Sequence, residues 1–190
     1  MKVRELDLPG VLLIEPEVFG DPRGYFFESY HAQRYRDAGI AAPFVQDNLS
    51  RSDAGILRGL HFQNPHTQGK LVQVLDGAAY DVVLDVRAGS PTFGRWVGET
   101  LTAENKRQLY APPGFAHGFC VVQAPVLFTY KVTDFYAPDA EVSVLWNDPD
   151  LAIPWPVSAP VLNAKDKAAP RLRDIPAERL PVFAADVGAR

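Results

Sequence analysis

The chain has 190 residues, of which 47% are hydrophobic and 22% charged, and its formal net charge is −4 at pH 7. This length suits one domain with a substantial core, so we predict a single domain over residues 1–190. The negative charge disfavours nucleic acid as a partner, because no basic surface for a phosphate backbone is expected. The acidic start lacks the apolar core of a signal peptide, and no later run is long enough to span a membrane. We therefore predict a soluble, cytoplasmic protein with no membrane partner.

The residue types predict a fold made mainly of β-strands. Seventeen prolines and fourteen glycines are spread along the chain among frequent Val, Phe and Tyr residues. This pattern favours many short strands joined by turns over a helical bundle. Without alternation of strands and helices, it predicts a jelly-roll barrel with a few short helices. The single cysteine, Cys120, has apolar neighbours, so we expect a buried and unreactive thiol.

The N-terminal part is predicted as an extended arm over about residues 1–20. Residues 10–19 are rich in Val, Leu and Ile but contain Pro16. Because proline cannot donate a backbone hydrogen bond, this stretch favours an arm or an edge strand, which we expect to lie against a partner.

A turn, an aromatic strand and a helix are predicted next. Residues 20–24 have the composition of a turn, and residues 25–29 form a short aromatic strand. Ser29 is the expected N-cap of a helix that runs to Ala38, with Gly39 as its end.

The middle of the chain is predicted to be entirely strands and turns. Residues 71–87 are heavily β-branched around Asp76-Gly77, which predicts a hairpin with these two residues as its turn. Further strands are expected at residues 90–101, 108–110, 126–132 and 141–146.

The C-terminal segment is predicted to be loosely packed over about residues 170–190. It is proline-rich and polar. Short helices are expected near Asp166 and Ala177.

The stretch at residues 57–63 (LRGLHFQ) places a cation and an imidazole on an apolar, strand-like segment. Arg58 and His61 are three residues apart, so a regular strand would direct them to opposite faces. A bulge at Gly59 would turn both toward one cavity. The alternative interpretation is a core histidine with Arg58 as a charge at the rim.

A second polar stretch lies between apolar residues at Gln46, Asp47 and Asn48. Three consecutive hydrogen-bonding side chains are unusual in a purely structural strand, which indicates a binding strand. An Asx-rich turn explains the same residues, and both interpretations remain open.

Two halves of a cupin pattern are present, one beginning at Gly59 and the other at residues 112–117 (PPGFAH). A metal-binding cupin places His-x-His followed by an acidic ligand in the first half, where this chain has Gln63 and Lys70. Because an ammonium group repels a divalent cation, we predict that the site holds no metal. An alternative set of three nitrogen ligands remains open: His61, His66 and His117.

Four motifs occur in one order: residues 57–63 (LRGLHFQ), 112–119 (PPGFAHGF), 130–136 (YKVTDFY) and 163–166 (NAKD). Together they resemble the dTDP-4-dehydrorhamnose 3,5-epimerase family over about residues 10–170. The resemblance implies a metal-free cupin jelly roll without a cofactor, forming a homodimer that exchanges N-terminal strands. It also implies inversion of dTDP-4-dehydro-6-deoxy-D-glucose at C3 and C5, as in dTDP-L-rhamnose biosynthesis. One departure is Asn163, where the family commonly has serine.

The same resemblance implies roles for individual residues. His61 is the base, Asp166 orients it, Tyr130 is the acid and Lys70 stabilises the enolate. Tyr136 stacks on thymine, and Phe26 lines the pocket. Other implied substrate contacts are Arg23, Glu28, Gln46, Asp47, Asn48, Arg58, His117, Glu141 and Lys165.

The chemistry of inversion agrees with these roles. Protons at C3 and C5 are acidic because both carbons adjoin the C4 ketone, and no redox cofactor is required. Inversion needs a base and an acid on opposite faces, which a neutral histidine and a tyrosine provide. Structural alternatives remain for three residues: a rim tyrosine for Tyr130, a solvated hairpin charge for Lys70 and a helix N-cap for Asp166.

Three other functions remain open. An epimerase that acts at C3 or C5 only has the same base and acid, and product analysis distinguishes it. A metal-dependent cupin oxygenase or isomerase requires a bound ion. A non-catalytic sugar-binding cupin would not incorporate solvent deuterium into its ligand.

Overall fold

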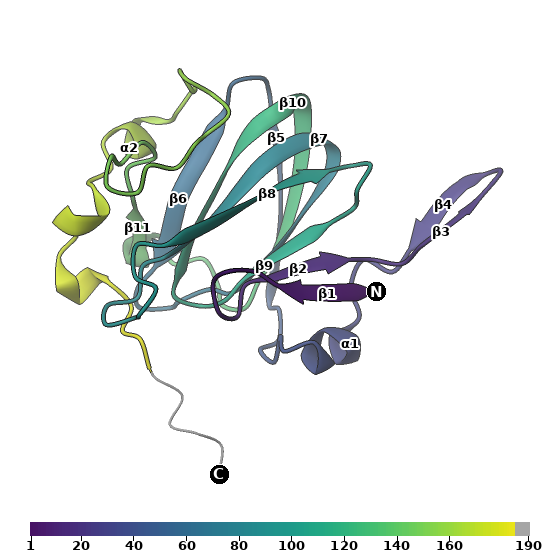
Figure 1. Cartoon of the computed structure of the whole chain (residues 1–190), viewed down its shortest axis with the longest axis horizontal. Coiled ribbons are helices and arrows are strands. Elements are labelled where there is room, and N and C mark those ends of the chain that lie inside the picture. The colour runs from purple at the N-terminus through teal and green to yellow at the C-terminus, as the bar shows by residue number, and fades with distance from the viewer. Residues whose placement is uncertain (185–190) are drawn as a thin grey trace, which may run out of the picture.

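The computed structural model describes residues 1–184, which form an antiparallel jelly roll (Figure 1). A nine-stranded sheet has the order β1-β2-β9-β7-β10-β6-β11, with β5 on β10 and β8 on β7, and β3 pairs with β4 separately. The mainly β prediction is confirmed. The strands are β1 (Lys2–Glu5), β2 (Leu12–Glu15), β3 (Val18–Asp21), β4 (Gly24–Phe27), β5 (Gln46–Ser52), β6 (Leu57–Gln63), β7 (Lys70–Asp85), β8 (Trp96–Thr102), β9 (Gln108–Ala111), β10 (Phe115–Val132) and β11 (Glu141–Ser143). The helices are α1 (Ala32–Asp37) and α2 (Ala164–Lys167), with 3-10 turns η1 (Pro138–Ala140), η2 (Leu172–Asp174) and η3 (Ala177–Arg179).

Two long strands, β7 of 16 residues and β10 of 18 residues, organise the barrel. They pair with each other along most of their length. The first part of β7 also pairs with β9, and the second part pairs with β8. In the same way, the first part of β10 pairs with β6 and the second with β5. β7 and β10 therefore each contribute to both sides of the barrel.

The predicted hairpin at residues 71–87 is wrong, because β7 is continuous through Asp76-Gly77. Gly77 has φ +75°, and a Cβ there would lie 2.2 Å from the Pro125 carbonyl oxygen, so only glycine fits. The register with β10 is irregular opposite this point, between Val121 and Leu127. An Asp-Gly pair suits a bulge as well as a turn, and pairing with β10 selects the bulge.

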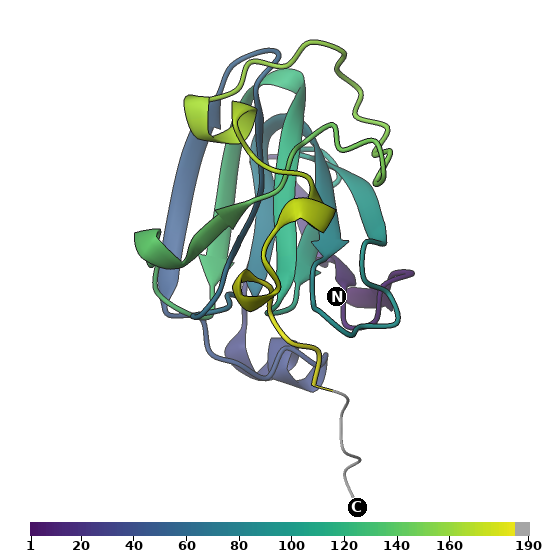
Figure 2. The ribbon, with the colours of Figure 1, turned by 90° about the vertical axis from the view of Figure 1, so that its left-hand side faces the viewer.

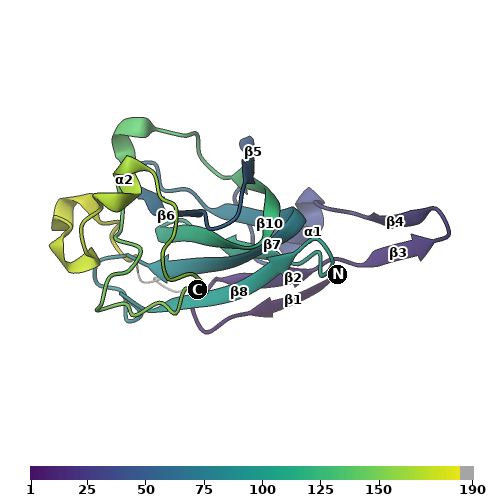
Figure 3. The same ribbon diagram turned by 90° about the horizontal axis from the view of Figure 1, so that it is seen from above.

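Residues 1–20 do not form one arm, which differs from the prediction. β2 lies within the main sheet between β1 and β9, and its Leu13 is buried in the barrel core. Pro16 follows β2 and separates it from β3. Among residues 1–184, it is the hairpin of β3 and β4 that projects from the body of the molecule, turning at Pro22 and Arg23 (Figures 1 and 3).

The first helix is shorter than predicted, and its N-cap is His31, not Ser29. The His31 ring nitrogen accepts a hydrogen bond from the Arg34 backbone N–H at 3.4 Å. The Ser29 carbonyl accepts hydrogen bonds from Tyr35 and Gln108, which hold this residue outside the helix. The helix ends before Gly39, as predicted. Among the described residues, no helix has the length and apolarity needed to cross a membrane.

Three apolar clusters stabilise the fold, one inside the barrel and two on its outer faces. Phe119 and Phe128 stack inside the barrel with ring centroids 4.1 Å apart. On one outer face, α1 packs through Tyr35. Cys120 is buried as predicted, and burial raises the pKa of its thiol to about 11. Each fully buried leucine contributes about 2 kcal/mol.

The other outer face is covered by the C-terminal segment (Figure 2). Leu172, Ile175 and Leu180 are buried there, so this segment packs more tightly than predicted. The predicted short helices correspond to α2 and η3. Residues 185–190 of the predicted loose segment lie outside the described residues.

Candidate active site

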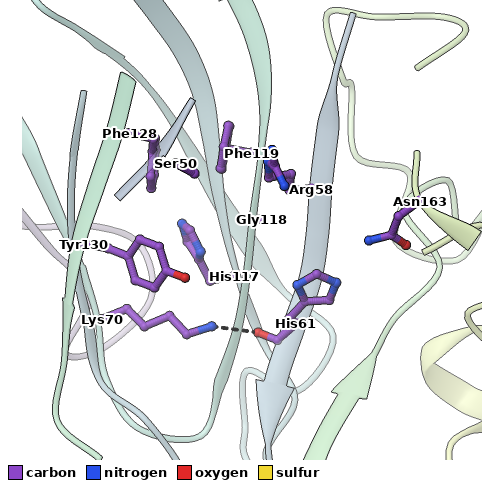
Figure 4. A pocket seen from close by; sticks show the side chains of 10 residues that line it. All are labelled: Ser50, Arg58, His61, Lys70, His117, Gly118, Phe119, Phe128, Tyr130 and Asn163. Atoms are coloured by element: carbon purple, nitrogen blue, oxygen red, sulfur yellow. Dashed lines mark hydrogen bonds between the residues drawn. The ribbon is translucent and has the colours of Figure 1, made fainter. Parts of the chain in front are cut away.

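A cavity of about 200 Å³ opens between β5, β6, β7 and β10. Charged, aromatic and small polar side chains from these strands converge on it (Figure 4). The lining residues are Ser50, Arg58, His61, Lys70, His117, Gly118, Phe119, Phe128, Tyr130 and Asn163.

A bulge in β6 turns Arg58 and His61 toward the same cavity, as the sequence predicts. Gly59 has φ +112°, and a Cβ there would lie 2.6 Å from the Gly118 Cα. The register between β6 and β10 shifts at this point, between His117 and Phe119. The interpretation of His61 as an ordinary core histidine therefore fails, because its ring lines a cavity.

Asp166 forms a hydrogen bond with the His61 ring and fixes its orientation. His61 Nε2 lies 2.6 Å from Asp166 Oδ1, and the Gly59 backbone N–H donates to Oδ2 at 3.3 Å. Burial disfavours the ionised carboxyl, but these hydrogen bonds outweigh it and lower the pKa of Asp166. An ionised Asp166 accepts the Nε2 proton, which leaves Nδ1 of a neutral ring as the basic nitrogen.

The position of Asp166 depends on Asn163, the one departure from the family motif. The Asn163 side chain accepts a hydrogen bond from the Asp166 backbone N–H at 2.7 Å and is the N-cap of α2. Asparagine and serine are both good N-caps, so this departure preserves the turn. The interpretation of Asp166 as the cap itself is wrong.

Tyr130 projects into the cavity from β10, on the other side from His61 (Figure 4). Burial raises the pKa of the Tyr130 phenol, against the opposing effect of Arg58. The phenol is therefore protonated at neutral pH and has a proton to donate.

Lys70 is buried beside the cavity, with only 8% of its surface exposed. Its Nζ donates a hydrogen bond to the His61 carbonyl oxygen at 3.1 Å (Figure 4). Burial lowers the pKa of Lys70 to about 8, while Glu141 and Asp81 act in the opposite direction. The interpretation as a solvated hairpin charge is wrong, and the ammonium faces a site partly shielded from water.

A polar cluster lies at the rim next to His61. The Glu141 carboxylate bonds with the Lys165 ammonium and accepts a hydrogen bond from the Tyr136 hydroxyl at 2.9 Å. It also lies 3.8 Å from His61 Nδ1. Burial disfavours the charged form, but Lys165 and Tyr136 outweigh it and lower the pKa of Glu141.

The polar stretch at residues 46–48 is part of strand β5, not a turn. Its burial alternates, so Gln46 and Asn48 lie on the inner face with Ser50, which lines the cavity. Asp47 lies on the outer face and bonds with Lys131 at 2.8 Å. Sequence reasoning missed Ser50, although the period of two along the strand would have indicated it.

Besides Asp47, the three predicted contacts from the N-terminal part of the chain are not brought to this cavity within one chain. Arg23, Phe26 and Glu28 lie on or just after the projecting hairpin (Figure 3). Arg23 bonds with Asp21, and Glu28 bonds with Arg34 at 3.0 Å. The Phe26 side chain is 70% exposed.

His117 lines the cavity and is paired with an aspartate that sequence reasoning missed. Its Nε2 lies 2.8 Å from Oδ2 of Asp81, which is fully buried on β7. The signal for Asp81 was an acidic residue within the β-branched run at 78–86, which also contains Asp85.

The alternative set of three histidine ligands is not assembled. His66 is exposed and lies 3.4 Å from Asp134 through Nδ1. Within residues 1–184, no group of three or more His, Cys, Asp or Glu side chains is arranged to hold a metal ion.

The fold and the cavity together define a cupin-like enzyme whose cavity is lined by a tyrosine and by a histidine paired with an aspartate. A sequence profile of the dTDP-4-dehydrorhamnose 3,5-epimerase family matches residues 5–174. The chain belongs to this family and is an isomerase of the epimerase class, which confirms the resemblance seen in its motifs.

Individual relatives agree over nearly the whole chain. A dTDP-4-dehydrorhamnose 3,5-epimerase of Pseudomonas aeruginosa is 53% identical over 176 residues, 92% of this chain and 97% of the relative. The crystal structure of a dTDP-6-deoxy-D-glucose-3,5-epimerase from Legionella pneumophila, in complex with dTDP-4-keto-L-rhamnose, has a TM-score of 0.94 at 51% identity, covering 97% and 99% of the two chains. A 3'-monoepimerase from Streptomyces bikiniensis, in complex with dTDP-quinovose, has a TM-score of 0.86 at 37% identity, covering 93% and 91%.

Proposed function

We propose that the chain, acting in the cytoplasm, converts dTDP-4-dehydro-6-deoxy-D-glucose into dTDP-4-dehydro-L-rhamnose by inversion at C3 and C5. The observation that carries this proposal is the position of His61 and Tyr130 on two sides of one cavity, with Lys70 beside them. Inversion requires removal of a proton from one face of the carbon and its return to the other. The two groups are of the right chemical kinds for these two steps.

Proton removal is assigned to His61 and Asp166. Nδ1 of the neutral ring takes the proton from the carbon next to the C4 ketone, while Asp166 keeps the other ring proton on Nε2. A general base positioned in this way typically contributes about 10²- to 10⁴-fold in rate. The imidazolium that forms is stabilised by the Asp166 carboxylate.

Removal of the proton leaves an enolate with its charge on O4. The Lys70 ammonium, directed by the His61 carbonyl, stabilises that charge in a partly desolvated site. Tyr130 then donates its proton to the opposite face of the ring. Because C3 and C5 adjoin the same carbonyl, the same three groups serve both inversions. Between them the His61 imidazolium gives up its proton and the Tyr130 phenolate regains one, with solvent as the proton acceptor and donor.

The cavity suits the sugar ring better than the whole nucleotide sugar. Its volume of about 200 Å³ is below the ~300–1,000 Å³ of pockets that enclose drug-sized ligands. We assign the sugar to this cavity and the dTDP moiety to the rim, with thymine stacked on Tyr136. The other substrate contacts that remain in our assignment are Arg58 and His117 in the cavity and Gln46, Asn48, Glu141 and Lys165 at the rim.

A homodimer would complete the site. Val18, Phe19, Tyr25 and Phe26 expose apolar surface on the projecting hairpin, as is typical of a surface that another chain covers. We propose that each hairpin reaches the cavity of the partner subunit and brings Arg23, Phe26 and Glu28 to the substrate. The exchange of N-terminal strands that the sequence predicts is therefore assigned to this hairpin.

Arg23→Ala is expected to raise KM about 10- to 100-fold, because a charge-assisted hydrogen bond to phosphate is worth ~1.5–3 kcal/mol. Subunit mixing tests where Arg23 acts. In a heterodimer of one His61→Ala and one Arg23→Ala subunit, an exchanged hairpin produces one site with both residues intact. Mixing the two variants should therefore restore activity at substrate concentrations below the raised KM. Restoration would fail if Arg23 served its own subunit, since each site would then carry one defect.

The second candidate function is inversion at one centre only, and it is favoured by the likeness to the Streptomyces bikiniensis 3'-monoepimerase. NMR of the product formed from the 4-keto sugar in D₂O distinguishes the two. We expect deuterium and inverted configuration at both C3 and C5. Inversion confined to one centre would replace the proposal with the monoepimerase, and no exchange at either centre would exclude both.

A further inference from the structure

Asp81 lies behind the cavity as a fully buried carboxylate that the proposed mechanism does not yet use. One of its oxygens, Oδ2, lies 2.8 Å from His117 Nε2. The other, Oδ1, is also buried and has no hydrogen-bond partner among the described residues. A carboxylate in this situation is costly unless a positive charge compensates for the lost hydration.

The bulge in β7 explains how Asp81 and Lys70 come to the same side of the strand. They are eleven residues apart, so a regular strand would direct them to opposite faces. Val72 and Val74 belong to the barrel core before the bulge, whereas Ala79 and Val83 belong to it afterwards. The change from even to odd positions at Gly77 therefore turns both Lys70 and Asp81 inward.

Lys70 and Asp81 are opposite charges that depend on each other. Burial lowers the pKa of Lys70 to about 8, and the negative charges of Glu141 and Asp81 oppose this change. Burial raises the pKa of Asp81, and His117 and Lys70 oppose that change. If Asp81 is neutralised, the Lys70 ammonium loses its proton more readily, and if Lys70 is neutralised, the Asp81 carboxylate takes up a proton more readily.

We propose that Asp81 is a positioning residue, whose buried carboxylate holds the His117 ring and supplies the countercharge that keeps the Lys70 ammonium protonated. This inference rests on the proposed function, in which the Lys70 cation stabilises the enolate. The other titratable or charged groups around the pair are Cys120 and Tyr130 of β10, Glu99 of β8 with its partner Arg4 of β1, Arg58 and His61 of β6, Asp166 of α2 and Glu141 of β11.

The test is Asp81→Asn, which keeps the size of the side chain and removes its charge. We expect kcat at pH 8 to fall about 5-fold, because a pKa one unit lower reduces the protonated fraction of Lys70 at that pH from about one half to about one tenth, with a smaller change in KM. The alkaline limb of the kcat profile, near pH 8 in the unmodified protein because Lys70 loses its proton there, should move to lower pH by about one unit. The loss should therefore be smaller at pH 6 than at pH 8.

A direct measurement separates this inference from the proposed function. The ¹³Cε resonance of Lys70, assigned with Lys70→Arg, reports its titration in the free protein without any substrate. Asp81→Asn should shift that titration to lower pH. Failure of the unmodified protein to epimerise its substrate would contradict the proposed function, whereas an unshifted Lys70 titration would contradict the inference alone.

Asp85→Asn is the matched control. Asp85 is also buried on β7, but it bonds with Arg87, Ser90 and Thr92 and does not line the cavity. The Asp85→Asn substitution should lower Tm by roughly 3–10 °C without moving the alkaline limb of the kcat profile or the Lys70 titration. Asp81→Ser, which leaves room for water, replaces Asp81→Asn if the latter does not fold. A folded Asp81 variant with both pH midpoints unmoved would overturn the proposal.

Discussion

His61→Ala is expected to lower kcat by at least ~10²-fold, the lower end of what a positioned general base contributes. The variant lacks the only group in our mechanism that removes a carbon-bound proton, so deuterium exchange from solvent should fall by the same factor. KM should change much less, because the imidazole is assigned to the reaction and not to binding. Product and exchange rates are measured together by NMR in D₂O.

Two comparisons make this result specific. Asp166→Asn should lose less activity than His61→Ala, because the ring remains while its tautomer and orientation are no longer held. His66→Asn is the control for loss of a histidine, since His66 is exposed and does not line the cavity. Asparagine also tolerates the φ of +67° found there. Near-normal turnover by a folded His61→Ala protein would remove His61 from the mechanism.

Tyr130→Phe is expected to separate proton removal from proton return. The base, the Lys70 ammonium and the shape of the cavity remain, and only the acid is lost. In D₂O the variant still forms the enolate, and His61, now carrying a solvent deuteron, returns it to the face that lost the proton. Deuterium should therefore enter at C3 or C5 while the rate of inversion falls by about 10²-fold or more. The measured quantity is the ratio of inverted to exchanged sugar.

The control for Tyr130→Phe removes a hydroxyl from another half-buried tyrosine. Tyr80 packs edge to face on Trp155 outside the cavity, so Tyr80→Phe should leave the ratio of inversion to exchange unchanged. Circular dichroism and thermal melting check that both variants are folded. An undiminished rate of double inversion in Tyr130→Phe would mean that a different group or a water molecule returns the proton.

Several features of the site followed from residue types within short motifs. His61, Lys70, Tyr130 and Asp166 are brought together as the motifs indicated. These residue types include the base and the acid that we assign to proton transfer next to a ketone. The bulge at Gly59 was also predictable. An arginine and a histidine three residues apart lie on opposite faces of a regular strand, and a bulge at the intervening glycine turns both toward one cavity.

Other features depended on contacts that no local pattern contains. Asp76-Gly77 was mistaken for a turn because the pairing of β7 with β10 involves residues about fifty positions away. The same bulge sets which residues of β7 face inward, and so it places Asp81 behind the cavity. The outward direction of Asp47 follows in a similar way from the pairing of β5 with β10.

The sequence by itself determined the mainly β class, the family and the side chains to which we assign the reaction, because composition, alternation and motif chemistry are properties of neighbouring residues. The tertiary structure alone decided the continuity of β7, the inclusion of Ser50 and Asp81, and the separation of Arg23 and Phe26 from the cavity of their own chain. The physical reason is that a strand's register and bulges are selected by the hydrogen bonds of the strand opposite, which lies far away in sequence.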